Sequence, residues 1–160
     1  MTSFRRELHL VGTMADLARI GAFIEEACAQ AHIDPAARFD LMMAVDEACS
    51  NIFEHAYNGL AGEVTLRFET RGRDVVITVR DHGRAFDPDG VPPPDMALPL
   101  EERPIGGLGL HLMRQLMDDI SFTFSPEHGN ILVMAKHGVA PVDPPTPTIG
   151  RRRSPARPKP

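Results

Sequence analysis

Glu47, Asn51 and His55 follow one another at intervals of four residues in a segment that the sequence predicts to be helical. Side chains spaced in this way line up along one face of a helix. A carboxylate can accept the proton of an attacking hydroxyl group, and a carboxamide oxygen is a suitable ligand for Mg²⁺. The spacing suggests Glu47 as a general base, Asn51 as a magnesium ligand and His55 as a structural partner near Asn51. A solvated polar stripe is the alternative.

A second stretch places a carboxylate and a glycine directly after a predicted strand. Asp81 follows the alternating segment 75–80, and Gly83 comes two residues later. A carboxylate at a strand end can accept a hydrogen bond from an exocyclic amine such as that of adenine, and a glycine lets the backbone approach a flat ring closely. A plain Asp-His-Gly turn is the alternative interpretation.

A third stretch, Gly-Gly-Leu-Gly-Leu over residues 106–110, precedes a predicted helix. Glycines let backbone N–H groups converge on phosphate oxygens, and a helix N-terminus favours an anion. The stretch is neither a Walker A loop nor a Rossmann fingerprint, because neither the Gly-Lys-Ser/Thr nor the leading strand is present. Arg103, shortly before it, is placed to reach a terminal phosphate. A flexible loop with a solvated charge would have the same composition.

Composition sets broad limits on the function. The chain has 160 residues and a net charge of −5, which suits one globular domain and disfavours a direct nucleic-acid partner. No apolar run is long enough to span a bilayer, and the N-terminus lacks the apolar core of a signal peptide. We therefore expect a cytoplasmic protein that does not contact membranes. Cys28 and Cys49 are expected to be free, buried thiols.

The predicted elements suggest an α+β fold. Apolar periodicity predicts strands over 4–11, 64–69, 75–80, 120–125 and 131–136, and helices over 14–31, 35–57 and 107–118. Strands joined by tight turns should be antiparallel. The simplest packing is a two-layer α/β sandwich with one mixed, mainly antiparallel sheet and three helices on one face.

The rest of the chain is expected to form a lid and a tail. The predicted domain covers residues 4–138, with a lid at about 88–106 in a Pro- and Asp-rich stretch that shows no periodicity. Residues 139–160 are rich in proline and arginine and have little apolar content to bury. We expect this tail to be disordered and the chain beyond about Val139 to be dispensable for folding.

The three stretches in this order resemble the motifs of the GHKL ATPase superfamily, the group of gyrase and the histidine kinases with the Bergerat ATP-binding fold. Residues 47–51 (Glu-Ala-Cys-Ser-Asn) resemble its N box, 81–88 its first glycine box and 106–110 its second. The sequence motifs Glu-Ala-x-x-Asn-x-x-x-His-Ala-Tyr and Gly-Gly-Leu-Gly-Leu-x-Leu-x-Arg are similar to those of the anti-sigma factor serine/threonine-protein kinases of bacterial partner-switching systems. The resemblance covers about residues 4–137.

The resemblance implies ATP and Mg²⁺ as cofactors, Glu47 as catalytic base and Asn51 as metal ligand. It implies that the nucleotide is bound by Asn51, Asp81, Gly83, Phe86, Arg103, Gly106, Gly107, Leu108, Gly109 and Leu110. Ala85 departs from the family, because many members carry a second glycine at that place. The implied substrate is a STAS-domain anti-anti-sigma protein, the second partner is a sigma factor, and the resemblance also implies a homodimer.

Two other functions fit parts of this pattern. A histidine kinase would need a dimerisation helix with a phospho-accepting histidine, but the residues before the Glu47 helix are predicted as one strand and one helix of the same domain. A pure binding module would hold a sigma factor or other regulator without phosphorylating a protein. The presence of both Glu47 and Asn51 favours the kinase over the binding module.

Overall fold

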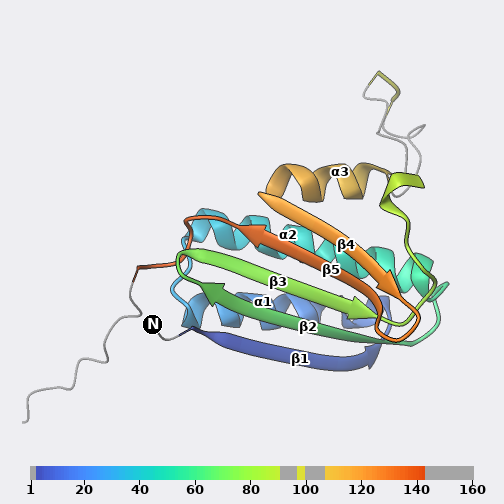
Figure 1. Ribbon diagram of the computed structural model, residues 1–160, viewed down its shortest axis with the longest axis horizontal. Coiled ribbons are helices and arrows are strands. Elements are labelled where there is room, and N and C mark those ends of the chain that lie inside the picture. The colour runs from blue at the N-terminus through green and yellow to red at the C-terminus, as the bar shows by residue number, and fades with distance from the viewer. Residues whose placement is uncertain (1–2, 91–96, 100–106, 143–160) are drawn as a thin grey trace, which may run out of the picture.

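A single five-stranded sheet forms one layer of the molecule. The computed structural model describes residues 3–90, 97–99 and 107–142, and of residues 107 and 108 only the backbone. The strands are β1 (Arg5–Gly12), β2 (Gly62–Arg71), β3 (Asp74–Asp81), β4 (Asp119–Ser125) and β5 (Gly129–Lys136). Their order is β1-β2-β3-β5-β4 and each neighbouring pair is antiparallel, so the described sheet is antiparallel rather than mixed (Figure 1).

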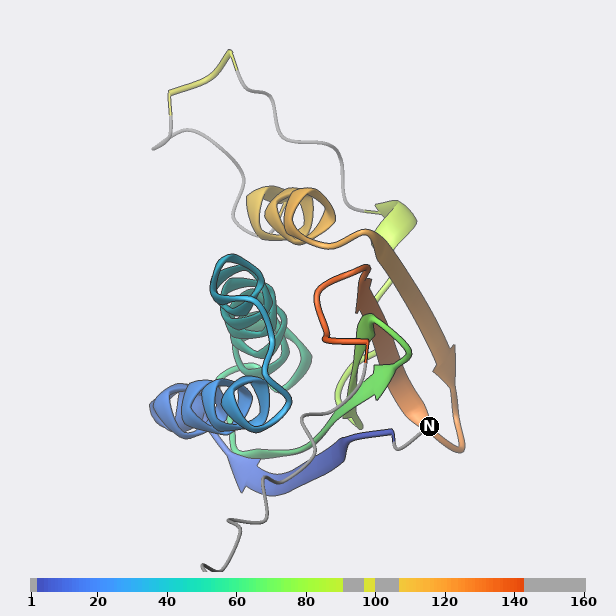
Figure 2. The same cartoon turned by 90° about the vertical axis from the view of Figure 1, so that its left-hand side faces the viewer.

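Three helices form the second layer on one face of the sheet, as Figure 2 shows in side view. They are α1 (Leu17–Gln30), α2 (Pro35–Asn51) and α3 (Gly107–Leu116). Short helical turns occur at η1 (Met14–Asp16), η2 (Ile52–Ala56) and η3 (Pro88–Gly90). The predicted two-layer α+β sandwich is confirmed.

Local sequence signals explain where the first two helical segments begin. The Thr13 hydroxyl accepts a hydrogen bond from the N–H of Ala15, and the Asp16 carboxylate accepts one from the N–H of Thr13, which together form a capping box. Pro35 occupies the first turn of α2, where its missing N–H costs nothing.

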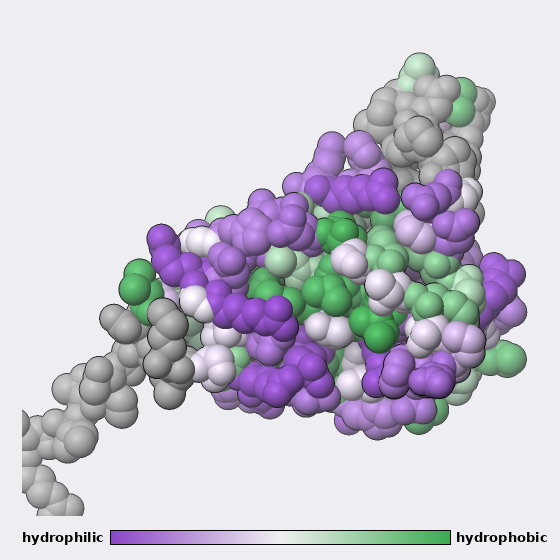
Figure 3. Space-filling view, in the orientation of Figure 1, coloured by the Kyte–Doolittle hydropathy of each residue, from purple (hydrophilic) through white to green (hydrophobic). Residues whose placement is uncertain are grey.

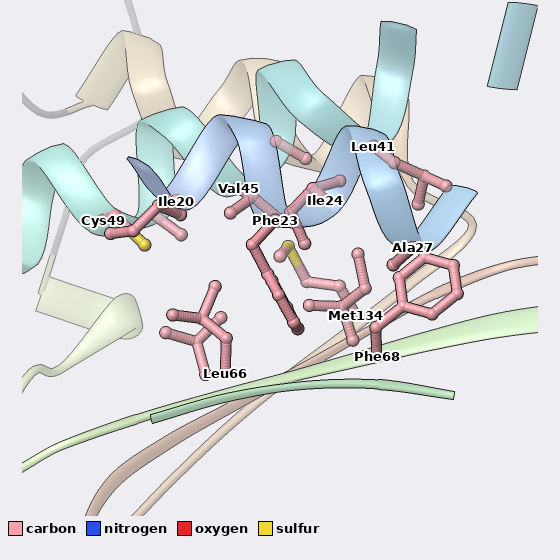
Figure 4. Close-up of a cluster of buried hydrophobic side chains, with 14 of the residues drawn as sticks. Ile20, Phe23, Ile24, Ala27, Leu41, Val45, Cys49, Leu66, Phe68 and Met134 are labelled. Carbon is pink, nitrogen blue, oxygen red and sulfur yellow. The ribbon is translucent and has the colours of Figure 1, made fainter. Parts of the chain in front are cut away.

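The core lies between the helices and the inward-facing side chains of the sheet (Figure 4). Leu66 and Phe68 alternate with exposed or half-buried residues along β2, as expected for a strand with one covered face. Helices α1 and α2 cover them with wholly or almost wholly buried side chains that include Ile20, Phe23, Ile24, Leu41 and Val45.

Both cysteines belong to this core and both are free. Neither Cys28 nor Cys49 exposes any surface. Burial raises the pKa of the Cys28 thiol to about 11 and that of the Cys49 thiol to about 12. The prediction of free, buried thiols is confirmed.

The opposite face of the sheet is apolar at its centre and charged at its flank. Figure 3 views this face and shows the hydrophobic side chains gathered between hydrophilic ones. The register places Val76 and Thr78 of β3 beside Ala135 and Val133 of β5, whereas β1 and β2 contribute charged side chains that include Arg5 and Glu69. The described residues include no helix long and apolar enough to cross a membrane.

The described part of the C-terminal segment is packed on the domain. The N–H groups of Val139 and Ala140 both donate to the carbonyl oxygen of Arg73 at 2.9 Å, and the N–H of Asp34 donates to that of Val139 at 3.2 Å. Ala140 is only 3% exposed. The predicted boundary at residue 138 is therefore too early, because residues 139 and 140 are hydrogen-bonded to Arg73 in the turn between β2 and β3. The remaining tail, 143–160, lies outside the described residues.

Truncation should separate these two parts of the C-terminus. A chain ending at Val142 is expected to unfold at nearly the same urea concentration as the full chain, because the deleted residues are poor in apolar side chains. A chain ending at His137 loses the hydrogen bonds to Arg73 and should be less stable by about 1–3 kcal/mol. Urea denaturation followed by circular dichroism measures both. A large loss of stability in the chain that ends at Val142 would show that residues 143–160 pack on the domain.

Candidate nucleotide site

The first part of the site lies where the end of α2 meets the start of α3. Glu47 and Asn51 are half-buried on α2, one turn apart. Gly109 of α3 faces both: a Cβ built on Gly109 would lie 2.5 Å from Glu47 Oε2 and 3.6 Å from Asn51 Nδ2. The fold therefore brings the first and third sequence stretches into direct contact, and a side chain at position 109 would require the Glu47 carboxylate to move.

The environment of Glu47 suits a proton acceptor. Its pKa is raised, first by burial and then by the neighbouring carboxylates of Asp46 and Glu54. A carboxylate with a raised pKa is a better base near neutral pH than an ordinary glutamate, which is the adjustment that general-base catalysis favours.

The helical face predicted from the four-residue spacing ends at Asn51. The turn η2 is π-helical, and the N–H of Tyr57 donates to the carbonyl oxygen of Ile52 at 3.0 Å. His55 therefore lies in this turn, beyond the helix that carries Glu47 and Asn51. His55 is exposed, with Nε2 3.9 Å from Glu54 Oε2. The described residues include no hydrogen bond between His55 and Asn51, so the role of His55 as a partner of Asn51 stays a prediction.

Asp81 forms the second part of the site at the end of β3. The side chain is only 4% exposed. Its Oδ1 atom accepts hydrogen bonds from the N–H of Gly83 at 2.9 Å and from Nδ2 of Asn130 at 3.0 Å. Burial raises the pKa of Asp81, and these two hydrogen bonds oppose the rise. Within the described chain Oδ2 has no hydrogen-bond partner, so one acceptor atom remains for a ligand.

Asn130 belongs to this part of the site and was missed by the sequence analysis. It lies on β5 directly opposite Asp81 in the antiparallel register, and it is 9% exposed. Its position became apparent only with the pairing of β3 and β5, which the sequence does not specify. An asparagine at the start of a buried strand is unfavourable, and that was the available signal.

Gly83 packs against the end of the helical segment that follows Asn51. A Cβ at position 83 would lie 2.7 Å from both the Cβ and the carbonyl oxygen of Ala56. The N–H of Arg84 donates to the same carbonyl oxygen at 3.0 Å. The glycine thus lets the loop after Asp81 reach η2, a contact that sequence reasoning did not anticipate. Its predicted role beside a purine ring remains a prediction.

Gly83→Ala is expected to destabilise the protein by about 1–3 kcal/mol, because backbone atoms of Ala56 would have to move. Gly21→Ala is the matched control: nothing lies within 4 Å of its added Cβ, and this helix position should become slightly more stable. Thermal unfolding of both variants measures the difference. Equal stability of the Gly83 variant and the parent would contradict the close contact.

The loop after Gly83 accommodates alanine at position 85, where many members of the GHKL superfamily carry a glycine. Among the described non-glycine residues only His32 and Asn58 have a positive φ, so the backbone at Ala85 does not require a glycine. Phe86 follows, and its ring packs against that of Phe122 with 5.0 Å between the ring centroids. Alanine therefore fits this loop without backbone strain.

The second glycine stretch is only partly described. Helix α3 begins at Gly107, as predicted. Leu110 is buried in the core, so only its backbone is available to a ligand. Arg103 and Gly106 lie outside the described residues, as does most of the predicted lid, and of Leu108 only the backbone is described. Their assigned roles remain predictions.

Comparison with known proteins identifies the family. A model described as the histidine kinase-like ATPase domain matches residues 10–136. The chain belongs to this family. The matched residues include the motifs on α2, β3 and α3 described above.

Within the family, the chain is similar to serine-protein kinases named RsbW. The protein from Bacillus thuringiensis (strain Al Hakam) is 37% identical over 102 residues, which cover 61% of this chain and 62% of that protein. The protein from Bacillus cereus (strain ATCC 10987 / NRS 248) is 38% identical over the same length. The match thus spans less than two thirds of these relatives. The resemblance to the GHKL superfamily and its anti-sigma factor kinases is confirmed.

A solved structure shares the fold. The crystal structure of the RsbU and RsbW domains of Rv1364c from Mycobacterium tuberculosis superposes with a TM-score of 0.59 at 17% identity. The match covers 85% of this chain and 33% of that chain. At this identity the similarity supports the architecture alone.

Proposed function

We propose that the protein is an ATP-dependent serine/threonine-protein kinase that phosphorylates a STAS-domain anti-anti-sigma protein and sequesters a sigma factor. The observation that carries this proposal is the convergence of Glu47 and Asn51 on Gly109. It places a carboxylate with a raised pKa and a carboxamide at the start of the glycine-rich helix. The similarity to proteins named serine-protein kinase RsbW supports the same reaction.

The described residues fit a magnesium–nucleotide complex. No three His, Cys, Asp or Glu side chains are grouped as a metal site in the described part of the chain, so a metal here would take few protein ligands. Mg²⁺ commonly binds in this way, through one or two protein oxygens together with phosphates and water. Asn51 is the proposed protein ligand, and Asp81 Oδ2 is the proposed acceptor for the adenine amine.

Each residue then has a defined task in phosphoryl transfer. Bound ATP and Mg²⁺ supply the phosphoryl group and neutralise its charge. Glu47 accepts the proton of the incoming seryl or threonyl hydroxyl group. The backbone N–H groups at the start of α3 are placed to donate to phosphate oxygens. Asp81 orients the base at the other end of the site.

Direct assay tests the proposal. The protein would be incubated with ATP, Mg²⁺ and each STAS-domain protein encoded in the same genome, and phosphoserine or phosphothreonine would be measured by mass spectrometry. We expect one STAS protein to be phosphorylated and a sigma factor to co-purify. ATP binding and sigma-factor capture without phosphorylation of any STAS protein would favour the alternative, a binding module that holds its partner without kinase activity.

A further inference from the structure

Asn130 fastens the loop after Asp81 to the sheet. Its Nδ2 atom donates to Asp81 Oδ1 at 3.0 Å, to the carbonyl oxygen of Arg84 at 2.9 Å and, more weakly, to that of Gly83 at 3.4 Å. Its Oδ1 atom accepts from the N–H of Phe86 at 3.0 Å. One buried side chain thus contacts a carboxylate and three backbone positions of residues 83–86.

These contacts require a carboxamide in one orientation. All three groups around Nδ2 are acceptors, and the group at Oδ1 is a donor. Turning the amide around would set its oxygen against the Asp81 carboxylate and its nitrogen against the N–H of Phe86. A carboxylate in place of the carboxamide would face the same acceptors without any hydrogen to donate.

The same contacts determine which oxygen of Asp81 is left for a ligand. Oδ1 already receives the N–H of Gly83 and Nδ2 of Asn130, whereas Oδ2 has no partner within the described residues. Hydrogen bonds to a carboxylate favour its ionised form, so Asn130 opposes the effect of burial on the pKa of Asp81. The other titratable groups around this carboxylate are His82, Tyr57 and Cys49.

We propose that Asn130 is a positioning residue of the nucleotide site, which fixes residues 83–86 and directs Oδ2 of an ionised Asp81 toward the exocyclic amine of a bound adenine nucleotide. The inference rests on the proposed nucleotide site. It adds a residue from β5, a strand that contributes to none of the three sequence stretches, and it explains how the loop keeps its place with alanine at position 85.

The test compares magnesium-ADP binding by calorimetry at pH 6 and pH 8. Asn130→Asp preserves size but sets two carboxyl groups side by side. At low pH the pair holds one proton and the added group can donate it to Asp81, whereas at high pH both ionise and repel. We expect ADP affinity near that of the parent at pH 6 and at least about tenfold weaker at pH 8. The ADP affinity of the parent should have the opposite pH dependence: it should weaken only as the pH falls and Asp81 takes up a proton.

Thr70→Val provides a matched control for stability. Thr70 is also 9% exposed, and its hydroxyl accepts from the N–H of Phe4 at 3.0 Å at the other end of the sheet. This variant should lose stability but bind ADP as the parent does. Asn130→Ser is the second variant of the site, and it tests the positioning role of Asn130 if the Asn130→Asp variant does not fold. We expect it to weaken ADP binding severalfold with no new pH dependence.

The Asp81→Asn variant distinguishes failure of the proposed nucleotide site from failure of the proposed role of Asn130. If it weakens ADP binding while both Asn130 variants bind like the parent at pH 8, the role of Asn130 is overturned and the nucleotide site stands. If Asp81→Asn itself binds ADP normally, the proposed nucleotide site is overturned, and the role of Asn130 with it. Equal weakening of ADP binding by the Thr70 and Asn130 variants would also overturn the positioning role, since it would reflect stability alone.

Discussion

Glu47→Gln is expected to phosphorylate the STAS partner about 10²–10⁴ times more slowly than the parent, the usual contribution of a general base. The glutamine keeps the shape of the side chain beside Gly109 and removes its ability to accept the hydroxyl proton. ATP affinity should change little, because the metal and the base of the nucleotide are assigned to Asn51 and Asp81. Single-turnover transfer and calorimetric ATP binding measure the two effects separately.

Asp46→Asn is the matched control for that experiment. Asp46 is the adjacent residue on α2, carries the same charge and is exposed. Its removal should leave transfer close to the parent rate, apart from a slight lowering of the raised pKa of Glu47. Comparable transfer rates in the Glu47 variant and the parent would show that Glu47 is not the base.

Transfer by the parent should also depend on pH through Glu47. A base with a raised pKa takes up a proton earlier as the pH falls, so the acid limb of the rate profile should lie above the ordinary range of a glutamate. The Glu47→Gln variant should lack this limb.

Asp81→Asn is expected to weaken ATP and ADP binding by about 1–3 kcal/mol. The N–H of Gly83 and Nδ2 of Asn130 both point at one oxygen of residue 81, so the single oxygen of an asparagine would have to face them. Its NH₂ group would then face the ligand, where it would meet the adenine amine, donor against donor. Isothermal titration calorimetry with ADP measures the loss.

Asp74→Asn controls for the removal of a carboxylate from the same strand. Asp74 begins β3 at the end remote from Asp81 and accepts a hydrogen bond from the N–H of Gly138 at 3.1 Å. This variant should bind ADP like the parent. Unchanged ADP affinity in the Asp81 variant would remove the adenine role from that residue.

The sequence predicted the elements better than the contacts between them. Periodicity placed all five strands and three helices, because one covered face imposes a repeat of about two residues on a strand and 3.6 on a helix. Contacts that depend on register or on a local irregularity were not visible. Asn130 meets Asp81 only through the pairing of β3 with β5, and α2 gives way to the π-helical turn η2 before His55.

The C-terminal boundary was misplaced for a related reason. Val139 and Ala140 stand at the start of a proline- and arginine-rich segment, so composition groups them with the tail. Their backbone groups nevertheless bond to Arg73 and Asp34, residues distant in the sequence. Composition averages over a window, whereas a boundary depends on individual hydrogen bonds.

The two buried thiols can be used to measure how often the folded protein opens. Because Cys28 and Cys49 are inaccessible and their pKa values are raised to about 11 and 12, a thiol reagent at neutral pH can react with them only in molecules that have transiently opened. A ligand that binds only the closed protein, at a concentration 100 times its Kd, suppresses opening by about 2.7 kcal/mol, or roughly a hundredfold in labelling rate. Labelling in the presence and absence of ADP therefore reports nucleotide binding without any partner protein or kinase assay.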